Sequence, residues 1–243
     1  MTPVDALKPV ARKRTVSKLK DAHIQRVIET TKQLMASEGI ESITIRGLAK
    51  ASGVAPATLY NRFVNKETLI SIVVVDHYER EVREGFTGGA DAGSPMEGFL
   101  GGLELLARTC HESPAFVRAV VGMYYSVGGN RNMPETMYKT LGNTLTELLD
   151  QMAQQGALKD WVCVDATCAE ICERCFSVVH RWVIDDIPGQ SLVNHLNFGA
   201  LSILIGVSQA AQAQQIEAML QQILREPGFR SRVEQGAQVP PCH

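Results

Sequence analysis

Two short helical segments that meet at a glycine turn constrain this sequence more than any other feature. They lie in the stretch TIRGLAKASGVAPATLYNRFVNKETL, residues 44–69. Thr44 is a typical N-cap for a helix over 45–52, and Pro56 is a favoured first residue for the next helix. Gly53 permits the tight turn between them. The pattern predicts a helix-turn-helix, whose second helix can enter the major groove of DNA.

Apolar residues recur at helical spacing on both sides of this stretch. Before it, the spacing predicts a helix from Asp21 to Glu38 that Gly39 ends. After it, Asn65 should cap a helix reaching about Glu84. Further helices are expected near 96–111, 114–127, 134–155, 163–185 and 190–224, the last with a break near Gly206 or Ala213. No segment alternates as a strand would, so the predicted fold is all-α.

Charge divides the chain into a basic N-terminal part and an acidic remainder. Residues 1–70 carry twelve Lys or Arg against six Asp or Glu, a net charge of +6, and the rest carries −8. Lys and Arg side chains neutralise phosphates and release their counterions, so a basic part on an acidic body suits a polyanionic partner at one end. Nucleic acid is the predicted partner of the N-terminal part.

The second helix of the pair should present a polar face beside its buried Leu59 and Phe63. Ala57, Thr58 and Asn61 lie within one turn of each other on that face and would reach base edges. An asparagine can pair with adenine through two hydrogen bonds, and a threonine methyl group can contact the thymine methyl group. Groups suited to phosphate surround the face: Thr44, Arg46, Tyr60, Arg62 and Lys66. Taken singly, Tyr60 and Leu59 are more commonly helix core, and Lys66 is more commonly a solvated charge. The whole pattern favours DNA contact.

The run T-I-R-x-L-A-x-x-S-G-V-A-x-x-T-L-Y-x-x-F-x-x-K-E-x-L resembles the signature of TetR-family transcriptional regulators. The resemblance is specific over residues 21 to about 75; beyond them only the helical layout is similar. By analogy, Thr44, Tyr60 and Lys66 contact the DNA backbone. Arg62 departs from the His or Tyr often found there, which should add a phosphate contact. The resemblance implies that the base-reading surface comprises Ala55, Pro56, Ala57, Thr58 and Asn61.

The resemblance also implies a domain organisation and a dimer. A flexible basic arm should occupy 1–20 and a flexible tail 227–243, with a three-helix DNA-binding domain at 21–66 and a helical ligand-binding and dimerisation domain at 67–226. Helices near 163–185 and 190–211 would pack against their symmetry mates and let two recognition helices read a palindromic operator. The second of these is apolar on much of its circumference. The alternative is a buried central helix of a monomer.

Bulky residues in the remaining helices are candidates for the wall of an effector pocket, although any one of them is more commonly core. The set is apolar and has few charges, which suits a large hydrophobic ligand. Two stretches, ESPAFVRAVVGMY and CFSVVHRWVIDDI, resemble TetR-type repressors of lipid and steroid degradation, which respond to acyl-CoA thioesters or related lipids. The candidates are Phe99, Leu103, Leu106, Phe116, Met123, Tyr124, Tyr125, Met137, Leu141, Cys172, Phe176, His180 and Trp182.

Other functions and sites find little support in the sequence. We expect no signal peptide, no membrane span and a cytoplasmic location, because the longest apolar run, 198–207, is too short to cross a bilayer. Cys168, Cys172 and Cys175 share a helical stripe that suits core thiols better than a metal or redox site. No cofactor is expected, and enzyme motifs are absent. A DNA-binding regulator without an effector, and an activator, stay open as alternatives.

Overall fold

The computed structural model describes residues 22–40, 42–63, 65–81, 94–125, 142, 145–226 and 229. Their regular structure is helical, with one isolated β-bridge between Leu158 and Ser208, so the predicted all-α class is confirmed. The chain divides into two compact units, Met1–Asp76 and His77–His243, each considered by itself below. The expected arm at 1–20 and the expected tail, apart from Phe229, lie outside the described residues.

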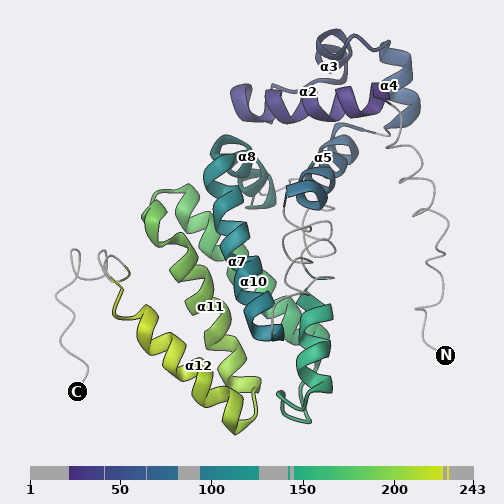
Figure 1. The fold of residues 1–243 in the computed structure, drawn as a ribbon. Coiled ribbons are helices and arrows are strands. Elements are labelled where there is room, and N and C mark those ends of the chain that lie inside the picture. Colours follow the sequence, from purple (N-terminus) through teal and green to yellow (C-terminus); the bar gives the residue numbers. More distant parts are fainter. Residues whose placement is uncertain are drawn as a thin grey trace, which may run out of the picture. The chain divides into compact units, whose positions relative to one another are not determined.

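Four helices, α2 to α5, begin the chain's described part (Figure 1). Their bounds are α2 Ala22–Glu38, α3 Ile45–Ser52, α4 Pro56–Arg62 and α5 Lys66–Glu81. The predicted helix-turn-helix is therefore present as α3 and α4. Gly39, with a φ of 80°, ends α2 where the sequence predicted a stop.

Apolar side chains hold these first helices together. Val27 of α2, Leu48 of α3 and Leu59 of α4 are completely buried. Thr31 is buried as well, and its hydroxyl donates to the carbonyl of Val27 one turn earlier, 2.6 Å away, so this polar group is satisfied. Burying a leucine side chain contributes roughly 1.5–3 kcal/mol. Such burial gives the short helices a stability that their length alone cannot supply.

The second unit is a bundle of longer helices. It contains α7 Pro95–Glu112, α8 Pro114–Tyr125, a helix over 145–154, α10 Val164–Val183, the short 3-10 turn Gly189–Ser191, α11 Leu192–Val207 and α12 Ala210–Ile223. Figure 1 shows α10, α11 and α12 following one another in the sequence colours from green to yellow. No helix among the described residues is long and apolar enough to cross a membrane.

The predicted break in the last long helix lies between α11 and α12. Ser208 is buried there, and its hydroxyl donates to the carbonyl of Leu204 at 2.8 Å. The segment after the helix over 145–154 supports the break, because the Lys159 N–H donates to Val207 and the Gln209 N–H donates to Ala157, each at 2.9 Å. Backbone groups freed at the helix ends are thus paired.

A single apolar core runs through the second unit. Phe99 and Leu103 from α7, Leu149, Ile171 from α10 and Leu204 from α11 are fully buried members of it. The three cysteines of the α10 stripe belong to the same core as free thiols, and the Cys168 Sγ donates to the Gly142 carbonyl at 3.3 Å. Burial raises the pKa of Cys175 to about 12, which keeps this thiol protonated.

The Gly53 turn gives a direct test of the fold. Its φ of 67° lies in the left-handed region, which costs a residue with a Cβ about 1–2 kcal/mol. We therefore expect Gly53→Ala to lower the free energy of unfolding by about that much, measured by urea unfolding followed by circular dichroism. Gly101→Ala is the matched control, because Gly101 lies in α7 where an added methyl group meets open space, so the change should be neutral or stabilising. Equal effects at both glycines would contradict this account.

Candidate nucleic-acid interface

Helix α3 begins at a capped threonine. The Thr44 backbone is extended, with φ −125° and ψ 149°, and its Oγ1 accepts a hydrogen bond from the Gly47 N–H at 3.0 Å. A Cβ on Gly47 would lie 3.0 Å from the same Oγ1, so a glycine leaves room for the cap. The Thr44 residue is exposed, and its hydroxyl proton is not used by this bond. Thr44 thus has the cap geometry that the sequence predicted.

The turn between α3 and α4 is closed by backbone hydrogen bonds. The Gly53 N–H and the Val54 N–H both donate to the Ala49 carbonyl, the second at 3.0 Å. The Val54 side chain is buried, whereas Gly53 itself is exposed. This closure is a left-handed helix end of the kind glycine favours. It fixes the direction in which α4 leaves the turn.

Helix α4 contributes one buried side chain and exposes nearly everything else. Leu59 is its only buried residue, and Phe63, which ends it, is buried as well. The Tyr60 side chain is 56% exposed, so its ring and hydroxyl are accessible from solvent. The residues expected to read bases are all exposed: Ala55, Pro56, Ala57, Thr58 and Asn61. Helix α4 is therefore held in place by one buried edge, and most of the rest of its surface is exposed to solvent.

Lys66 is held by a contact that the sequence did not reveal. Its Nζ donates to the Ile40 carbonyl at 3.2 Å, bridging 26 positions between the end of α2 and the start of α5. An ammonium has three N–H donors, so this bond directs the group and leaves donors for a second acceptor. Asn65 caps α5 as predicted, because its Oδ1 accepts from the Thr68 N–H at 2.7 Å. The Lys66 ammonium group and the Asn65 cap therefore lie together at the N-terminus of α5.

The whole stretch from Thr44 to Lys66 carries positive charge only. Arg46 and Lys50 are exposed on α3, Arg62 is half-buried on α4, and no Asp or Glu occurs in the stretch. Lys50 was absent from the residues expected to contact DNA, although it is as exposed as Arg46 and lies in the last turn of α3. The positive charge of Lys50 is the one feature of the sequence that could have identified it as a DNA contact. A surface of this sign attracts phosphates.

The candidate pocket residues divide by burial. Fully or nearly fully buried in the core are Phe99, Leu103, Phe116, Cys172 and Trp182. Partly exposed are Leu106, Met123, Tyr124, Phe176 and His180, and Tyr125 is exposed. Met137 and Leu141 lie outside the described residues. The candidates thus include packed core positions and a smaller group that solvent or a ligand can reach.

Four of the partly exposed or exposed candidates form an aromatic cluster between α8 and α10. The Tyr124 ring lies 4.9 Å from Tyr125 and 5.1 Å from Phe176, and Tyr125 lies 4.5 Å from His180, measured between ring centroids. The Tyr124 hydroxyl donates to the Glu173 carboxylate at 2.8 Å. Burial and this carboxylate raise the pKa of Tyr124, so the phenol stays neutral. The aromatic cluster therefore combines broad ring surfaces with three polar groups, of which the Tyr124 hydroxyl is hydrogen-bonded to Glu173.

Comparison with known proteins agrees with this geometry. Residues 27–71 match the family model described as bacterial regulatory proteins, tetR family. The HTH-type transcriptional regulator UidR of Escherichia coli (strain K12) is 24% identical over 186 residues, covering 74% of this chain and 90% of UidR.

Solved structures show the same fold over most of the chain. Thermus thermophilus FadR, a TetR-family transcriptional repressor solved with lauroyl-CoA, has a TM-score of 0.64 at 18% identity over 75% of this chain and 94% of its own. RolR, solved with resorcinol, has a TM-score of 0.59 at 21% identity over 85% of this chain and 95% of its own.

The Thr44 cap can be tested by isosteric replacement. Thr44→Val keeps the shape of the side chain and removes its oxygen, so it should cost about 1 kcal/mol of the free energy of unfolding. Thr44→Ser keeps the oxygen and should stay close to the parent protein. Urea unfolding of both variants gives the comparison. Valine and serine variants of equal stability would show that the hydroxyl does not cap α3.

Proposed function

Because the chain is a TetR-family DNA-binding transcriptional regulator, we propose that it is a repressor that binds a palindromic operator as a homodimer and is released by a hydrophobic small molecule. The family consists of regulators rather than enzymes. We assign 21–66 to DNA binding, 67–226 to effector binding and dimerisation, and the protein to the cytoplasm. The observation that carries the proposal is the exposed face of α4 within a stretch of positive charge.

The proposed base contacts come from α4. Asn61 has an amide that can donate to and accept from an adenine edge, and it lies one turn after Ala57 on the exposed surface. Thr58 offers a methyl group for a thymine methyl, and Ala55 and Pro56 allow close approach at the helix start. A helix with one buried residue can enter the major groove without losing its anchor, because the anchor lies on the opposite edge.

The proposed phosphate contacts surround that face. Arg46 and Tyr60 are exposed, and Arg62 is half-buried beside them. The Thr44 hydroxyl can donate to a phosphate while its oxygen caps α3. Lys66 is held against Ile40, so its remaining donors reach a phosphate with less loss of side-chain freedom than a lysine in solvent would suffer. Such contacts position the protein and supply affinity independent of sequence.

Dimerisation through α10 and α11 is supported by composition and packing. Helix α11 contains no Asp, Glu, Lys or Arg, and Phe198, Ile205 and Val207 are only partly buried within one chain. Helices α10 and α11 pack against each other and would present a common surface. Two copies would place their recognition helices on successive major-groove faces, about 34–36 Å or a multiple apart.

The aromatic cluster is the proposed place of the effector. Its rings come from two helices and offer a broad aromatic surface, with the Tyr124 hydroxyl already hydrogen-bonded to Glu173, which suits acyl-CoA, another lipid or a steroid-like molecule. That the related FadR binds lauroyl-CoA supports this class, whereas RolR binds the smaller resorcinol. Release requires that the effector prefer a dimer shape in which the recognition helices no longer match the groove. An activator, or a regulator without effector, would share the DNA-binding surface.

Two substitutions separate the proposed phosphate and base contacts. Lys66→Ala should weaken binding to every DNA sequence and reduce the slope of log K against log salt by about one, because one phosphate contact is lost. Asn61→Ala should relax the preference at one base position. Fluorescence anisotropy on DNA from upstream of the protein's own gene measures both. Lys159→Ala is the matched control, since its Nζ also donates to a backbone carbonyl, that of Gly206. An equal loss of sequence preference in both variants would contradict the assignment.

The effector is tested by the same anisotropy measurement with a panel of acyl-CoA thioesters and steroids. One class should release the DNA at saturation, and Phe176→Ala should weaken that release at least about tenfold, as expected when a large apolar contact is removed. Trp161→Ala is the control, because this tryptophan is 70% exposed and lies outside the aromatic cluster. DNA binding that no compound disturbs would favour the regulator without effector.

A further inference from the structure

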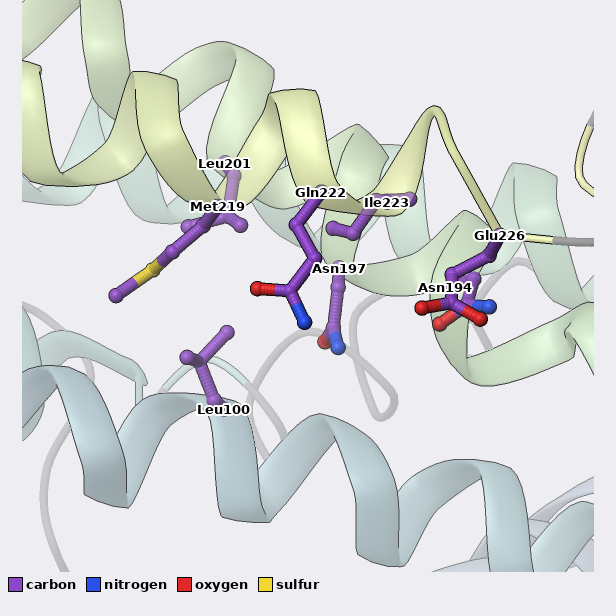
Figure 2. A pocket seen from close by; sticks show the side chains of 8 residues that line it. All are labelled: Leu100, Asn194, Asn197, Leu201, Met219, Gln222, Ile223 and Glu226. Atoms are coloured by element: carbon purple, nitrogen blue, oxygen red, sulfur yellow. The ribbon is translucent and has the colours of Figure 1, made fainter.

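A hollow of about 210 Å³ lies between α7, α11 and α12 of the second unit. Figure 2 shows its walls: Leu100 rises from α7, while Asn197 and Gln222 point down toward it from α11 and α12. The full lining is Leu100, Asn194, Asn197, Leu201, Met219, Gln222, Ile223 and Glu226. None of these belongs to the aromatic cluster or to the candidate pocket residues, so the hollow is a separate place on the molecule.

Asn197 gives this hollow a requirement for a hydrogen-bond donor. Its Oδ1 is buried and has no hydrogen-bond partner among the residues that the structure describes. A buried acceptor left unpaired costs free energy, and native proteins rarely leave one so. Because Asn197 lies in the wall and is directed into the hollow, a bound molecule with an O–H or N–H group can satisfy it from there (Figure 2).

The other walls define what kind of molecule fits. Asn194, Gln222 and the Glu226 carboxylate supply further acceptors and two amide donors, and no Lys, Arg or His occurs in the lining. Aliphatic side chains lie among these polar groups on all three helices: Leu100 on α7, Leu201 on α11 and Ile223 on α12. A carboxylate or phosphate would meet Glu226 without a compensating cation. A neutral molecule that carries both hydroxyl and C–H groups matches this mixed lining.

We propose that the hollow between α7, α11 and α12 is a second small-molecule site that binds a neutral polyhydroxylated compound of about monosaccharide size. The volume is below the 300–1,000 Å³ of pockets for larger ligands, which excludes acyl chains and steroids from this site. Hydroxyl groups donate to the Asn197 Oδ1 and the Glu226 carboxylate, and C–H groups pack on the aliphatic side chains of Leu100 and Leu201. This site is independent of the proposed effector site and of DNA binding.

Methionine methyl groups provide a direct probe of the site. Met219 lines the hollow, whereas Met152 is buried in the core and does not line it. In the full-length protein carrying carbon-13 methyl-labelled methionine, D-galactose or myo-inositol should shift the Met219 resonance saturably, with a Kd of about 1 mM for a ligand this small. The Met152 resonance should stay in place. D-galacturonate, the same ring with a carboxylate, should bind at least about tenfold more weakly.

A pair of variants ties the binding to Asn197. Asn197→Leu keeps the side-chain size, removes the buried acceptor and should weaken binding of the neutral probes at least about tenfold without lowering Tm. Gln215→Leu is the matched control, because Gln215 is exposed on α12 outside the lining and should leave binding unchanged. The proposal is overturned if neither probe moves Met219, if galacturonate binds as well as galactose, or if Asn197→Leu binds like the parent protein. The measurement contains no DNA, so a negative result here would not contradict the proposed repressor function, which the anisotropy experiments test separately.

Discussion

The burial of Leu59 is the interaction on which the DNA-binding surface depends. Helix α4 has seven residues, far fewer than an isolated helix needs to be stable in water, and Leu59 is its only buried side chain. Phe63 secures its end, and the Gly53 turn secures its start. The exposed residues of α4 can face a ligand because these three positions hold the helix. One edge of this short helix thus stabilises it by packing in the core, and the other edge is exposed for binding.

Polar groups around α4 are arranged so that the structural hydrogen bonds and the proposed DNA contacts use different atoms. The Thr44 oxygen accepts from Gly47, which leaves its hydroxyl proton as a donor. Lys66 gives one N–H to Ile40 and keeps others. These bonds hold the groups in place before DNA arrives, and a group already ordered loses less entropy on binding. The same arrangement makes Lys66 both a link between α2 and α5 and a proposed phosphate contact.

The second unit offers two chemically different places within one helical bundle. The aromatic cluster of α8 and α10 is mostly ring surface, and its Tyr124 hydroxyl is already paired with Glu173. The hollow of α7, α11 and α12 has amides and a carboxylate, with the Asn197 oxygen unpaired. A satisfied polar edge favours a hydrophobic ligand, and an unsatisfied one favours a ligand that donates a hydrogen bond. A single protein can therefore have separate sites for different compounds.

The sequence by itself determined the all-α class, the helix-turn-helix and most helix ends, because caps, left-handed glycines and apolar spacing act over a few neighbouring residues. Thr44, Asn65 and Gly53 took their predicted places for this reason. The tertiary structure alone decided contacts between distant positions. It paired Lys66 with Ile40, and it placed Phe99 in the core but Phe176 in the aromatic cluster, although both are bulky aromatics on amphipathic helices. It also brought Asn197 and Gln222 to one hollow, since such placements depend on how whole helices pack.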